Sequence, residues 1–366
     1  MGDYVNILDT TLRDGEEAPG FGLTTPQKIE LAHQLARLGV DAIEAGFPAV
    51  SPESFEAVQR IARSVRGPII TGLARAVPAD IDQCWEAIRA AERPRIHTFL
   101  PTADMHLEGL RREQAKARAV AMVARARSYT ADVEFSPMDA TRADWAYVAE
   151  VFESVIDVGA TTVNIPDTLG FAQPDELVLL VTYLRERVAN IDQATISVHC
   201  HNDLGLAVAN SLAAIGAGAR QVECCINGIG ERAGNAALEE LVMALTVRRD
   251  HHHVEHGVQL EQLVPTSSLL QQFTGVLVQP NKAVVGVNAF GNDAGMPQDV
   301  LKGALRARLE QLGLLLTQDE LNHAFTGFKR LSDDKSELTD ADLVQLANHG
   351  RRAADGVFDA FVHVYR

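Results

Sequence analysis

The first 46 residues contain the pattern that decides the fold. Residues 5–9 read VNILD, residues 26–38 read PQKIELAHQLARL, and residues 42–46 read AIEAG. The first and third stretches are short and mostly apolar, which is typical of buried strands. In the second, apolar residues recur at helical spacing, and Gly39 follows as a stop signal. The order strand, helix, strand predicts a βαβ unit with parallel strands.

The same alternation continues to about residue 250. Segments long enough for a crossover helix separate eight strand-like runs: Val5–Asp9, Ala42–Gly46, Pro68–Leu73, Arg95–Leu100, Asp132–Ser136, Thr162–Ile165, Ile196–His199 and Gln221–Cys225. Eight such units predict an α/β protein of the closed (β/α)8 TIM-barrel type. An open doubly wound sheet is the alternative, but no Gly-rich dinucleotide-binding fingerprint follows the first strand.

The alternation of strands and helices ends near Pro265. We therefore expect residues 1–265 to form a catalytic barrel and residues 266–366 to form a small, mainly helical C-terminal region. Within the latter, Arg306–Leu315 and Asp340–Asn348 have helical patterns, and a charged stretch from Lys329 to Asp342 lies between them.

Composition excludes several classes of protein. The chain has 366 residues, with 49 acidic and 33 basic side chains and a net charge of −16, which argues against a nucleic-acid partner because phosphate binding needs clustered Lys and Arg. No apolar stretch reaches the roughly 18 residues of a membrane helix, so we expect no membrane partner. The four cysteines lack disulfide-framework spacing and the N-terminus lacks a secretory signal, which predicts a reduced, cytoplasmic protein.

Polar residues gather at the C-terminal ends of the predicted strands, where barrel enzymes place their chemistry. His199 and His201 are two residues apart on a predicted strand, so both side chains point to the same face. Two imidazoles and one carboxylate make a common divalent-metal site, and Asp14 after the first strand is the natural third ligand. The two histidines alone are equally compatible with ordinary packing, but Arg13 and Asp14 together with them favour the metal.

Two further features have more than one interpretation. Arg13 can form a salt bridge to Glu44, or stabilise an enolate oxygen where negative charge develops, and these roles can coexist. The loop Gly228–Asn235 is either a Gly-rich turn before the last barrel helix or a source of backbone amides and of Asn235 at the barrel mouth. The run His251–His253 could bind a second metal, but a solvated loop is the simpler interpretation.

Four long motifs resemble those of one enzyme family. They are Asp9-Thr10-Thr11-Leu12-Arg13-Asp14-Gly15-Glu16, Ile43-Glu44-Ala45-Gly46-Phe47-Pro48, His199-Cys200-His201-Asn202-Asp203-Leu204-Gly205 and Gly228-Ile229-Gly230-Glu231-Arg232-Ala233-Gly234-Asn235. Together they resemble the 2-isopropylmalate synthase and homocitrate synthase family of metal-dependent barrel enzymes. The similarity runs from about residue 5 to residue 290 and resumes near Leu305, and Phe47-Pro48 is more similar to the isopropylmalate branch.

The resemblance implies a Claisen-type condensation of acetyl-CoA, or a related acyl-CoA, with a 2-oxo acid, followed by thioester hydrolysis to a 2-alkylmalate. It implies a homodimer and a divalent cation, Mn²⁺, Mg²⁺ or Zn²⁺. The metal residues carried over are Asp14, His199 and His201, with Asn235 nearby. Arg13, Glu44 and His97 would be catalytic, since Arg13 would polarise the reacting oxygens and Glu44 would orient Arg13. His97, Ser136 and Thr168 would line the 2-oxo acid pocket together with Arg13.

The chain also departs from the family pattern. Met138 stands where the family places a catalytic glutamate, and a thioether can neither take nor give a proton. Asn292 and Pro297 stand where histidines are usual, and Glu17 replaces a glutamine. After Asp299 the chain omits about thirty residues that the family uses as a lid and linker. We therefore expect an intact metal half of the site and an altered acid–base half.

These departures leave two alternative functions open. The first is a metal-dependent carbon–carbon lyase or aldolase on the same scaffold that does not use CoA, because Met138 and the shortened lid both remove parts devoted to the CoA half-reaction. The second is a non-catalytic relative that binds a metabolite, against which the complete metal set argues. Without a C-terminal feedback domain, allosteric inhibition by leucine is not expected.

Overall fold

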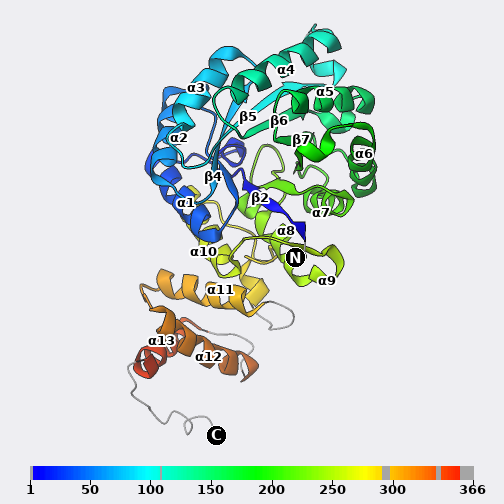
Figure 1. Cartoon of the computed structure of the whole chain (residues 1–366). Coiled ribbons are helices and arrows are strands. Elements are labelled where there is room, and N and C mark those ends of the chain that lie inside the picture. The colour runs from blue at the N-terminus through cyan, green and yellow to red at the C-terminus, as the bar shows by residue number, and fades with distance from the viewer. Residues whose placement is uncertain (1–2, 108, 291–296, 335–338, 355–366) are drawn as a thin grey trace. The chain divides into compact units, whose positions relative to one another are not determined.

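The computed structural model describes residues 3–107, 109–290, 297–334 and 339–354 (Figure 1). The chain divides into two compact units, Met1–Val258 and Gln259–Arg366. The sequence placed the division at residue 265, which lies in the first turn of helix α10 (Leu263–Thr274). Proline is tolerated there because the first N–H groups of a helix have no partner within it.

The first unit is built on eight parallel strands that close into a barrel in chain order. The strands are β2 (Asn6–Asp9), β3 (Ala42–Glu44), β4 (Ile69–Arg75), β5 (Pro94–Pro101), β6 (Val133–Met138), β7 (Thr162–Asp167), β8 (Thr195–Cys200) and β9 (Gln221–Cys224). The last strand pairs with the first, with Asn6 opposite Gln221 and Asp9 opposite Cys224. This closure confirms the predicted TIM barrel and excludes the open sheet.

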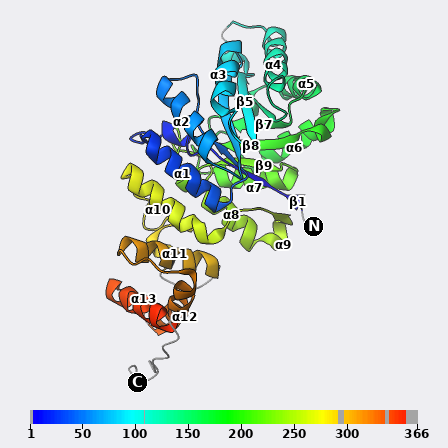
Figure 2. The same cartoon turned by 60° about the vertical axis from the view of Figure 1, so that its left-hand side comes forward.

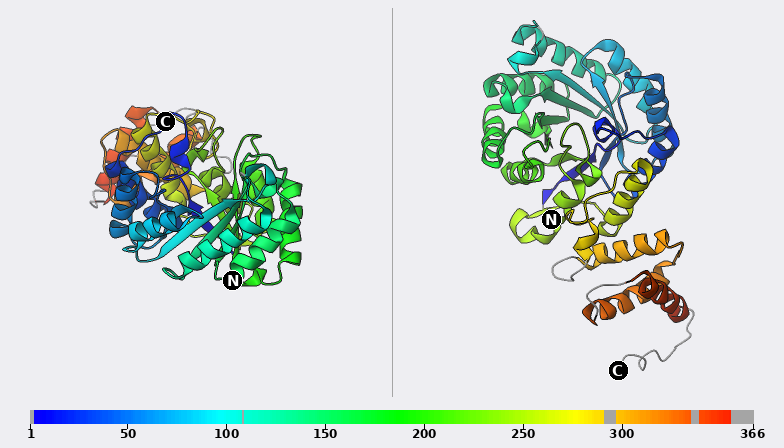
Figure 3. Two further views of the ribbon diagram at one scale, coloured as in Figure 1. Left: turned by 90° about the horizontal axis from the view of Figure 1, so that it is seen from above. Right: turned by 180° about the vertical axis from the view of Figure 1, so that it is seen from behind.

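One helix follows each barrel strand, and the helices surround the strands in all views (Figures 2 and 3). They are α1 (Thr25–Leu38), α2 (Pro52–Ser64), α3 (Pro78–Ile88), α4 (Arg112–Arg127), α5 (Trp145–Asp157), α6 (Pro174–Arg187), α7 (Ala207–Ala217) and α8 (Leu238–Val247). A short helix, α9 (Arg249–His252), leads to β10 (Val254–Glu255), which pairs in parallel with β1 (Asp3–Tyr4).

Helix α1 illustrates how local signals set the ends of an element. The Thr24 N–H donates to the Gln27 side chain at 2.9 Å, so the helix begins with a capping box. Leu31 and Leu35 are fully buried one turn apart on the face that packs inward. Gly39 ends the helix in the left-handed conformation, at φ 83°. The predicted helix over residues 26–38 is confirmed.

Strand alternation directs polar side chains into the barrel. On β8, Ser197 and His199 share one face, and the Ser197 hydroxyl accepts a hydrogen bond from Gln221 of β9 at 3.0 Å. Glu223 lies two residues after Gln221 and pairs in register with His199. The inner faces of neighbouring strands therefore stack polar residues in layers toward the C-terminal mouth, where the candidate site lies.

The second unit is mainly helical, as predicted. Besides α10 it contains α11 (Gln298–Gln311), α12 (Gln318–Asp334) and α13 (Asp340–Ala354). Leu301, Leu305 and Leu309 repeat at four-residue spacing on α11 and join one apolar core with α12 and α13. The sequence pattern began α11 too late, at residue 306, and did not identify α12 as a helix of its own.

The sequence predicted reduced cysteines and no membrane-spanning helix. All four cysteines are free and buried, so the described part of the chain contains no disulfide. None of the helices over the described residues has the length and apolar character that crossing a bilayer requires.

Candidate active site

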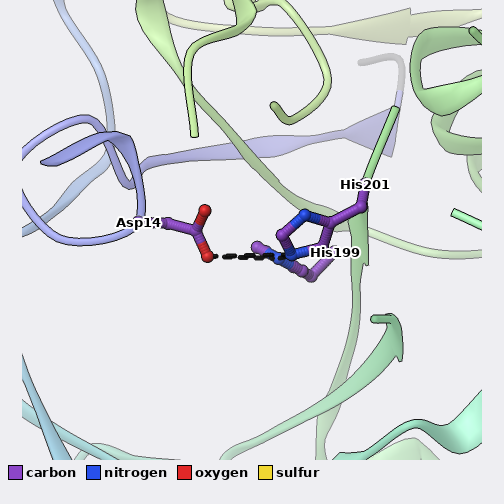
Figure 4. A group of neighbouring side chains, drawn as sticks. All are labelled: Asp14, His199 and His201. Atoms are coloured by element: carbon purple, nitrogen blue, oxygen red, sulfur yellow. Dashed lines mark hydrogen bonds and ion pairs between the residues drawn. The ribbon is translucent and has the colours of Figure 1, made fainter. Parts of the chain in front are cut away.

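Asp14, His199 and His201 converge at the barrel mouth (Figure 4). The two imidazole Nε2 atoms lie 2.9 Å apart. The Asp14 Oδ2 atom lies 3.6 Å from His199 Nε2 and 3.8 Å from His201 Nε2. All three residues are at most 5% exposed. Their donor atoms point at one common position, although the residues come from the loop after β2 and from the end of β8.

The protonation states of His201 and Asp14 suit a cation. Burial and the neighbouring His199 lower the pKa of His201 to about 3, which keeps His201 as the neutral, ligating imidazole. Burial would raise the pKa of Asp14, but Arg13 and the two imidazoles hold it well below its usual range. A carboxylate and two imidazoles within this spacing form a donor set that fits a divalent transition metal.

Asn235 contacts Asp14 directly. Its Nδ2 donates to Asp14 Oδ1 at 2.6 Å and to the Ile229 carbonyl at 3.1 Å. Its Oδ1 is buried without a hydrogen-bond partner among the described residues. A Cβ on Gly230 would come within 2.1 Å of the Asn235 Nδ2 atom, so only glycine allows the loop to pack this closely. Asn235 thus orients Asp14 through the oxygen that faces away from the histidines.

Arg13 connects the metal group to the barrel interior. Its guanidinium donates to Asp14 Oδ2 at 2.7 Å and to Glu44 Oε2 at 2.5 Å. Burial would lower the pKa of Arg13, but the carboxylates of Glu44 and Asp14 raise it, so the side chain is always charged. Both interpretations made from the sequence therefore stay compatible, because Arg13 pairs with Glu44 and also lies beside the metal group.

His97 continues this network on the opposite side of Glu44. Its Nδ1 lies 2.7 Å from Glu44 Oε1, and its Nε2 lies 2.7 Å from the Ser136 hydroxyl. Burial opposes protonation, but Glu134 and Glu44 raise the pKa of His97 to about 9. Asn164 also donates to the Ser136 hydroxyl, at 2.9 Å. His97 is therefore a buried cation at neutral pH that fixes the Ser136 side chain.

Thr168 lies on the loop after β7 and is not hydrogen-bonded to this network. Its hydroxyl accepts the backbone N–H of Asp139, at 3.0 Å, and its carbonyl accepts from Arg232, at 2.6 Å. The structure thus joins Ser136 and His97 directly and places Thr168 in a second set of contacts at the C-terminal ends of β6 and β7.

Met138 is directed into the barrel mouth. It lies two residues after Ser136 on β6, so both side chains have the same orientation, and Ser136 reaches His97 in the interior. By strand alternation, Met138 therefore presents a thioether to the barrel mouth.

The other departures lie elsewhere. Pro297 immediately precedes α11 in the second unit, and Asn292 lies outside the described residues. Glu17 is the last residue of the 3-10 turn Gly15–Glu17, which follows Asp14, and it is exposed. Burial of part of its side chain nevertheless raises the pKa of its carboxyl group.

The sequence motifs did not identify Glu223 as a residue of the site. Its Oε2 lies 2.8 Å from His199 Nδ1 and 3.9 Å from the Arg13 guanidinium. Glu223 raises the pKa of His199 against the effect of burial and orients its ring. The alternation of Gln221 and Glu223 on an otherwise apolar strand was the available signal, since polar residues at alternate positions face the barrel interior.

A second group of potential donors lies deeper in the barrel. His97, Glu134 and Glu223 bring one ligand atom each within 4.8 Å of one another. Both ring nitrogens of His97 already have partners, and Arg95 pairs with Glu134 at 3.1 Å. The run His251–His253 is in neither group of possible metal-binding residues found in the described part of the chain.

Comparisons with known proteins agree with this geometry. The model of the family described as HMGL-like matches residues 4–270. The 2-isopropylmalate synthase of Pyrococcus furiosus is 52% identical over 375 residues, which cover 94% of this chain and 75% of that protein. The 2-isopropylmalate synthase of Syntrophus aciditrophicus is 53% identical over 371 residues, which cover 93% of this chain and 72% of that protein.

Both alignments are longer, by roughly thirty residues, than the part of this chain that they cover. The relatives therefore contain additional residues within the aligned region whose total is close to the omission expected after Asp299. Among solved structures, the hydroxymethylglutaryl-CoA lyase of Pseudomonas aeruginosa has the same fold, with a TM-score of 0.63 and 20% identity, covering 76% of this chain and 95% of that one.

Proposed function

This chain belongs to the HMGL-like family, and we propose that it catalyses the metal-dependent condensation of acetyl-CoA, or a related acyl-CoA, with a 2-oxo acid. The products are a 2-alkylmalate and free CoA. The 2-isopropylmalate synthases that share about half of its residues over most of its length support this reaction over a lyase.

One observation of the structure carries the proposal. An unbroken chain of contacts, each between 2.5 and 2.7 Å, joins the Ser136 hydroxyl to the metal group. Its members, in order, are Ser136, His97, Glu44, Arg13 and Asp14. The residues proposed to bind a 2-oxo acid and those proposed to bind a cation are thereby held in one network, which supports a reaction that needs both reactants to be positioned together.

We assign the cation to Asp14, His199 and His201, with Asn235 fixing the orientation of Asp14. Of the three candidate ions, Mn²⁺ and Zn²⁺ suit two imidazoles and a carboxylate better than Mg²⁺, which prefers oxygen ligands. When bound, the cation supplies Lewis-acid polarisation of the oxo group.

Arg13, Glu44 and His97 supply the catalytic charges. The Arg13 guanidinium faces the position where an oxyanion develops, and Glu44 holds it there through the 2.5 Å contact to Nε. The protonated His97 donates a hydrogen bond to Ser136, whose hydroxyl can donate to a substrate oxygen in turn. Condensation removes a proton from the acyl methyl group and adds one to the oxo oxygen, and water then cleaves the thioester.

Ser136 and Thr168 are the proposed neutral contacts of the 2-oxo acid, together with Arg13 and His97. Met138 takes no part in proton transfer and forms an apolar part of the mouth. We also propose a cytoplasmic protein, supported by four buried free cysteines, and a homodimer, supported by the resemblance of the motifs.

The direct test is release of CoA thiol from acetyl-CoA. The purified chain is incubated with Mn²⁺ and a panel of 2-oxo acids that differ in their alkyl group, and the thiol is titrated with a chromogenic disulfide. We expect release that requires both the metal and one class of 2-oxo acid. The variant H97N should lower it by about 10² or more, because it removes the cation that fixes Ser136.

The matched control is H251N, which changes an exposed histidine of α9. It should leave the rate unchanged. Absence of thiol release with every 2-oxo acid, in protein that binds Mn²⁺ and melts cooperatively, would exclude the synthase reaction. Cleavage of a 2-hydroxy acid under the same conditions would establish the lyase alternative.

A further inference from the structure

Arg232 has an unusual backbone conformation for its residue type. Its φ of 57° lies in the left-handed region, which disfavours side chains other than glycine, asparagine and aspartate. Residues are kept in such conformations only where their surroundings determine them, and these positions cluster at functional sites. Arg232 belongs to the loop of residues 228–235 that follows β9 and carries Asn235.

The Arg232 side chain bridges three loops at the barrel mouth. Its Nε and one terminal nitrogen form a fork on the two carboxylate oxygens of Asp203, at 2.8 and 2.9 Å, on the loop after β8. The same side chain donates to the Thr168 carbonyl on the loop after β7, at 2.6 Å. A further bond, to Glu231 at 2.9 Å, stays within its own loop. We name the contacts of Arg232 with Asp203 and Thr168 the loop clamp.

The loop held by this clamp determines where Asp14 lies. The Asn235 N–H donates to the Gly228 carbonyl at 3.0 Å, which closes the loop, and the Asn202 N–H donates to the Gly234 carbonyl at 2.8 Å. His201 and Asn235 form an isolated antiparallel bridge. From this fixed position the Asn235 amide reaches Asp14 at 2.6 Å.

We propose that Arg232 is a positioning residue that sets the spacing between the two halves of the metal group. One half is the histidine pair on β8, and the other is Asp14 on the loop after β2. Asp203 lies two residues after His201, on the loop next to the histidine pair. Asn235 lies three residues after Arg232 and contacts Asp14. The clamp therefore links the loop beside the histidines to the loop that supports Asp14. The proposal rests on the metal site of the proposed function.

The chemistry explains why the residue is arginine. A planar guanidinium can bind both carboxylate oxygens and still donate to a carbonyl, whereas a lysine ammonium is a single point donor on a flexible stem. Groups that hydrogen-bond directly to metal ligands, as Asn235 does to Asp14, typically contribute 10- to 100-fold to metal affinity, and the clamp acts through Asn235. The Arg232 side chain is 31% exposed, so its replacement does not remove part of the hydrophobic core. An effect on Mn²⁺ affinity would therefore arise from the changed geometry of the loops.

The experiment measures Mn²⁺ affinity by titration calorimetry of metal-free protein. R232G removes the clamp while allowing the left-handed backbone, R232K keeps the charge, and D203N weakens the fork from the other side. We expect R232G to raise the Kd for Mn²⁺ by about tenfold or more, with R232K intermediate. R232G and D203N both act on the same contact, between Arg232 and Asp203. The double variant R232G/D203N should therefore bind Mn²⁺ no more weakly than R232G alone.

Arg112 provides a matched control. It forks onto Asp104 at 2.8 and 2.7 Å and contacts Asp144 at 2.8 Å, so it bridges the loops after β5 and β6 in the same manner. R112K should leave the Kd for Mn²⁺ unchanged. The melting temperatures of the metal-free variants show whether each one folds, and if R232G does not, R232K and D203N carry the same test.

Unchanged Mn²⁺ affinity in the folded Arg232 and Asp203 variants would overturn the clamp while leaving the metal site in place. Equal weakening in R112K would also overturn it, since the effect would then be one of general loop stability. If the parent chain itself binds no Mn²⁺, the metal site of the proposed function fails, and the clamp fails with it.

Discussion

Arg13 is the residue on which both halves of the site depend. It is 14% exposed and contacts Asp14 and Glu44, with Glu223 nearby at 3.9 Å. A buried guanidinium among carboxylates is stable only while those partners stay in place, because an unpaired buried charge is costly. Any change that moves Glu44 or Asp14 is therefore expected to displace the Arg13 guanidinium, and with it the positive charge that stabilises the reacting oxygens.

At the same scale, Met138 is expected to limit the rate. Strand alternation from Ser136 directs its side chain to the mouth, so we expect a carboxylate there to reach the acyl methyl group. We predict that M138E raises metal-dependent thiol release by about 10², the size of a general-base contribution. M138Q, which has the same shape without a titratable group, should not. Equal rates for the two variants, both folded, would contradict this placement of Met138.

The sequence located most of the site residues but not their connections. Asp14, His199 and His201 were recognisable because strand periodicity and chain order alone bring them to the same end of the barrel. Asn235 was expected with the metal residues, and the structure shows that its Nδ2 donates to Asp14 Oδ1. That contact depends on the path of a loop, as does the clamp by Arg232, and residue spacing contains no information about it.

Among the elements, the loop after β9 does most to shape the site. Gly230 has a φ of 152°, and a Cβ there would lie 2.1 Å from Asn235 Nδ2 and 2.8 Å from Asp14 Oδ1. We predict that G230A displaces Asn235 and lowers Mn²⁺ affinity by about tenfold, measured by calorimetry.

The control for this loop is G205A. Gly205 also has a positive φ, of 71°, on the neighbouring loop after β8, but a Cβ there would meet no atom within 4 Å. G205A therefore also places an alanine at a positive φ, but without the collision. If the two variants lose Mn²⁺ affinity equally, backbone strain rather than the contact with Asn235 is responsible, and the assigned role of Gly230 is wrong.

Strand predictions in the barrel were more complete than helix predictions in the second unit, where the helix expected from Asp340 is present as α13 but α12 was not identified. The barrel strands are buried on both faces, so their apolar runs stand out from the flanking loops. Helices α11 to α13 bury one stripe each against the others, and their remaining surface is charged. The charged run from Lys329 onward therefore concealed the end of α12 (Gln318–Asp334), which the structure shows to be helical.

At the scale of the whole molecule, buried titratable groups make stability depend on pH. Burial raises the pKa of Asp9 from 3.8 to about 7, and it raises that of Glu134 as well. The pKa of His97 is raised from 6.5 to about 9 by Glu134 and Glu44 against burial. Each group binds its proton more tightly in the folded state, so its contribution to stability is complete below its unfolded pKa and is lost as pH rises through its folded pKa.

We therefore predict that the melting temperature of the metal-free protein falls as pH rises from about 6 to about 9, because Asp9 and then His97 lose their protons in this window. E134Q should make the fall less steep, since it removes one of these groups and one of the charges that favour protonated His97. The exposed Glu113 gives the control, E113Q, which should follow the parent curve. A melting temperature that stays constant over this range would contradict the assigned charge states.

The most direct test of the whole account is an anomalous difference map from crystals grown with Mn²⁺. Two groups of donors are present among the described residues, one of Asp14, His199 and His201 and the other of His97, Glu134 and Glu223. We predict one Mn²⁺ peak, within coordination distance of Asp14 Oδ2 and of both Nε2 atoms of the first group. A peak at the second group alone, or no peak at the first at saturating Mn²⁺, would contradict it.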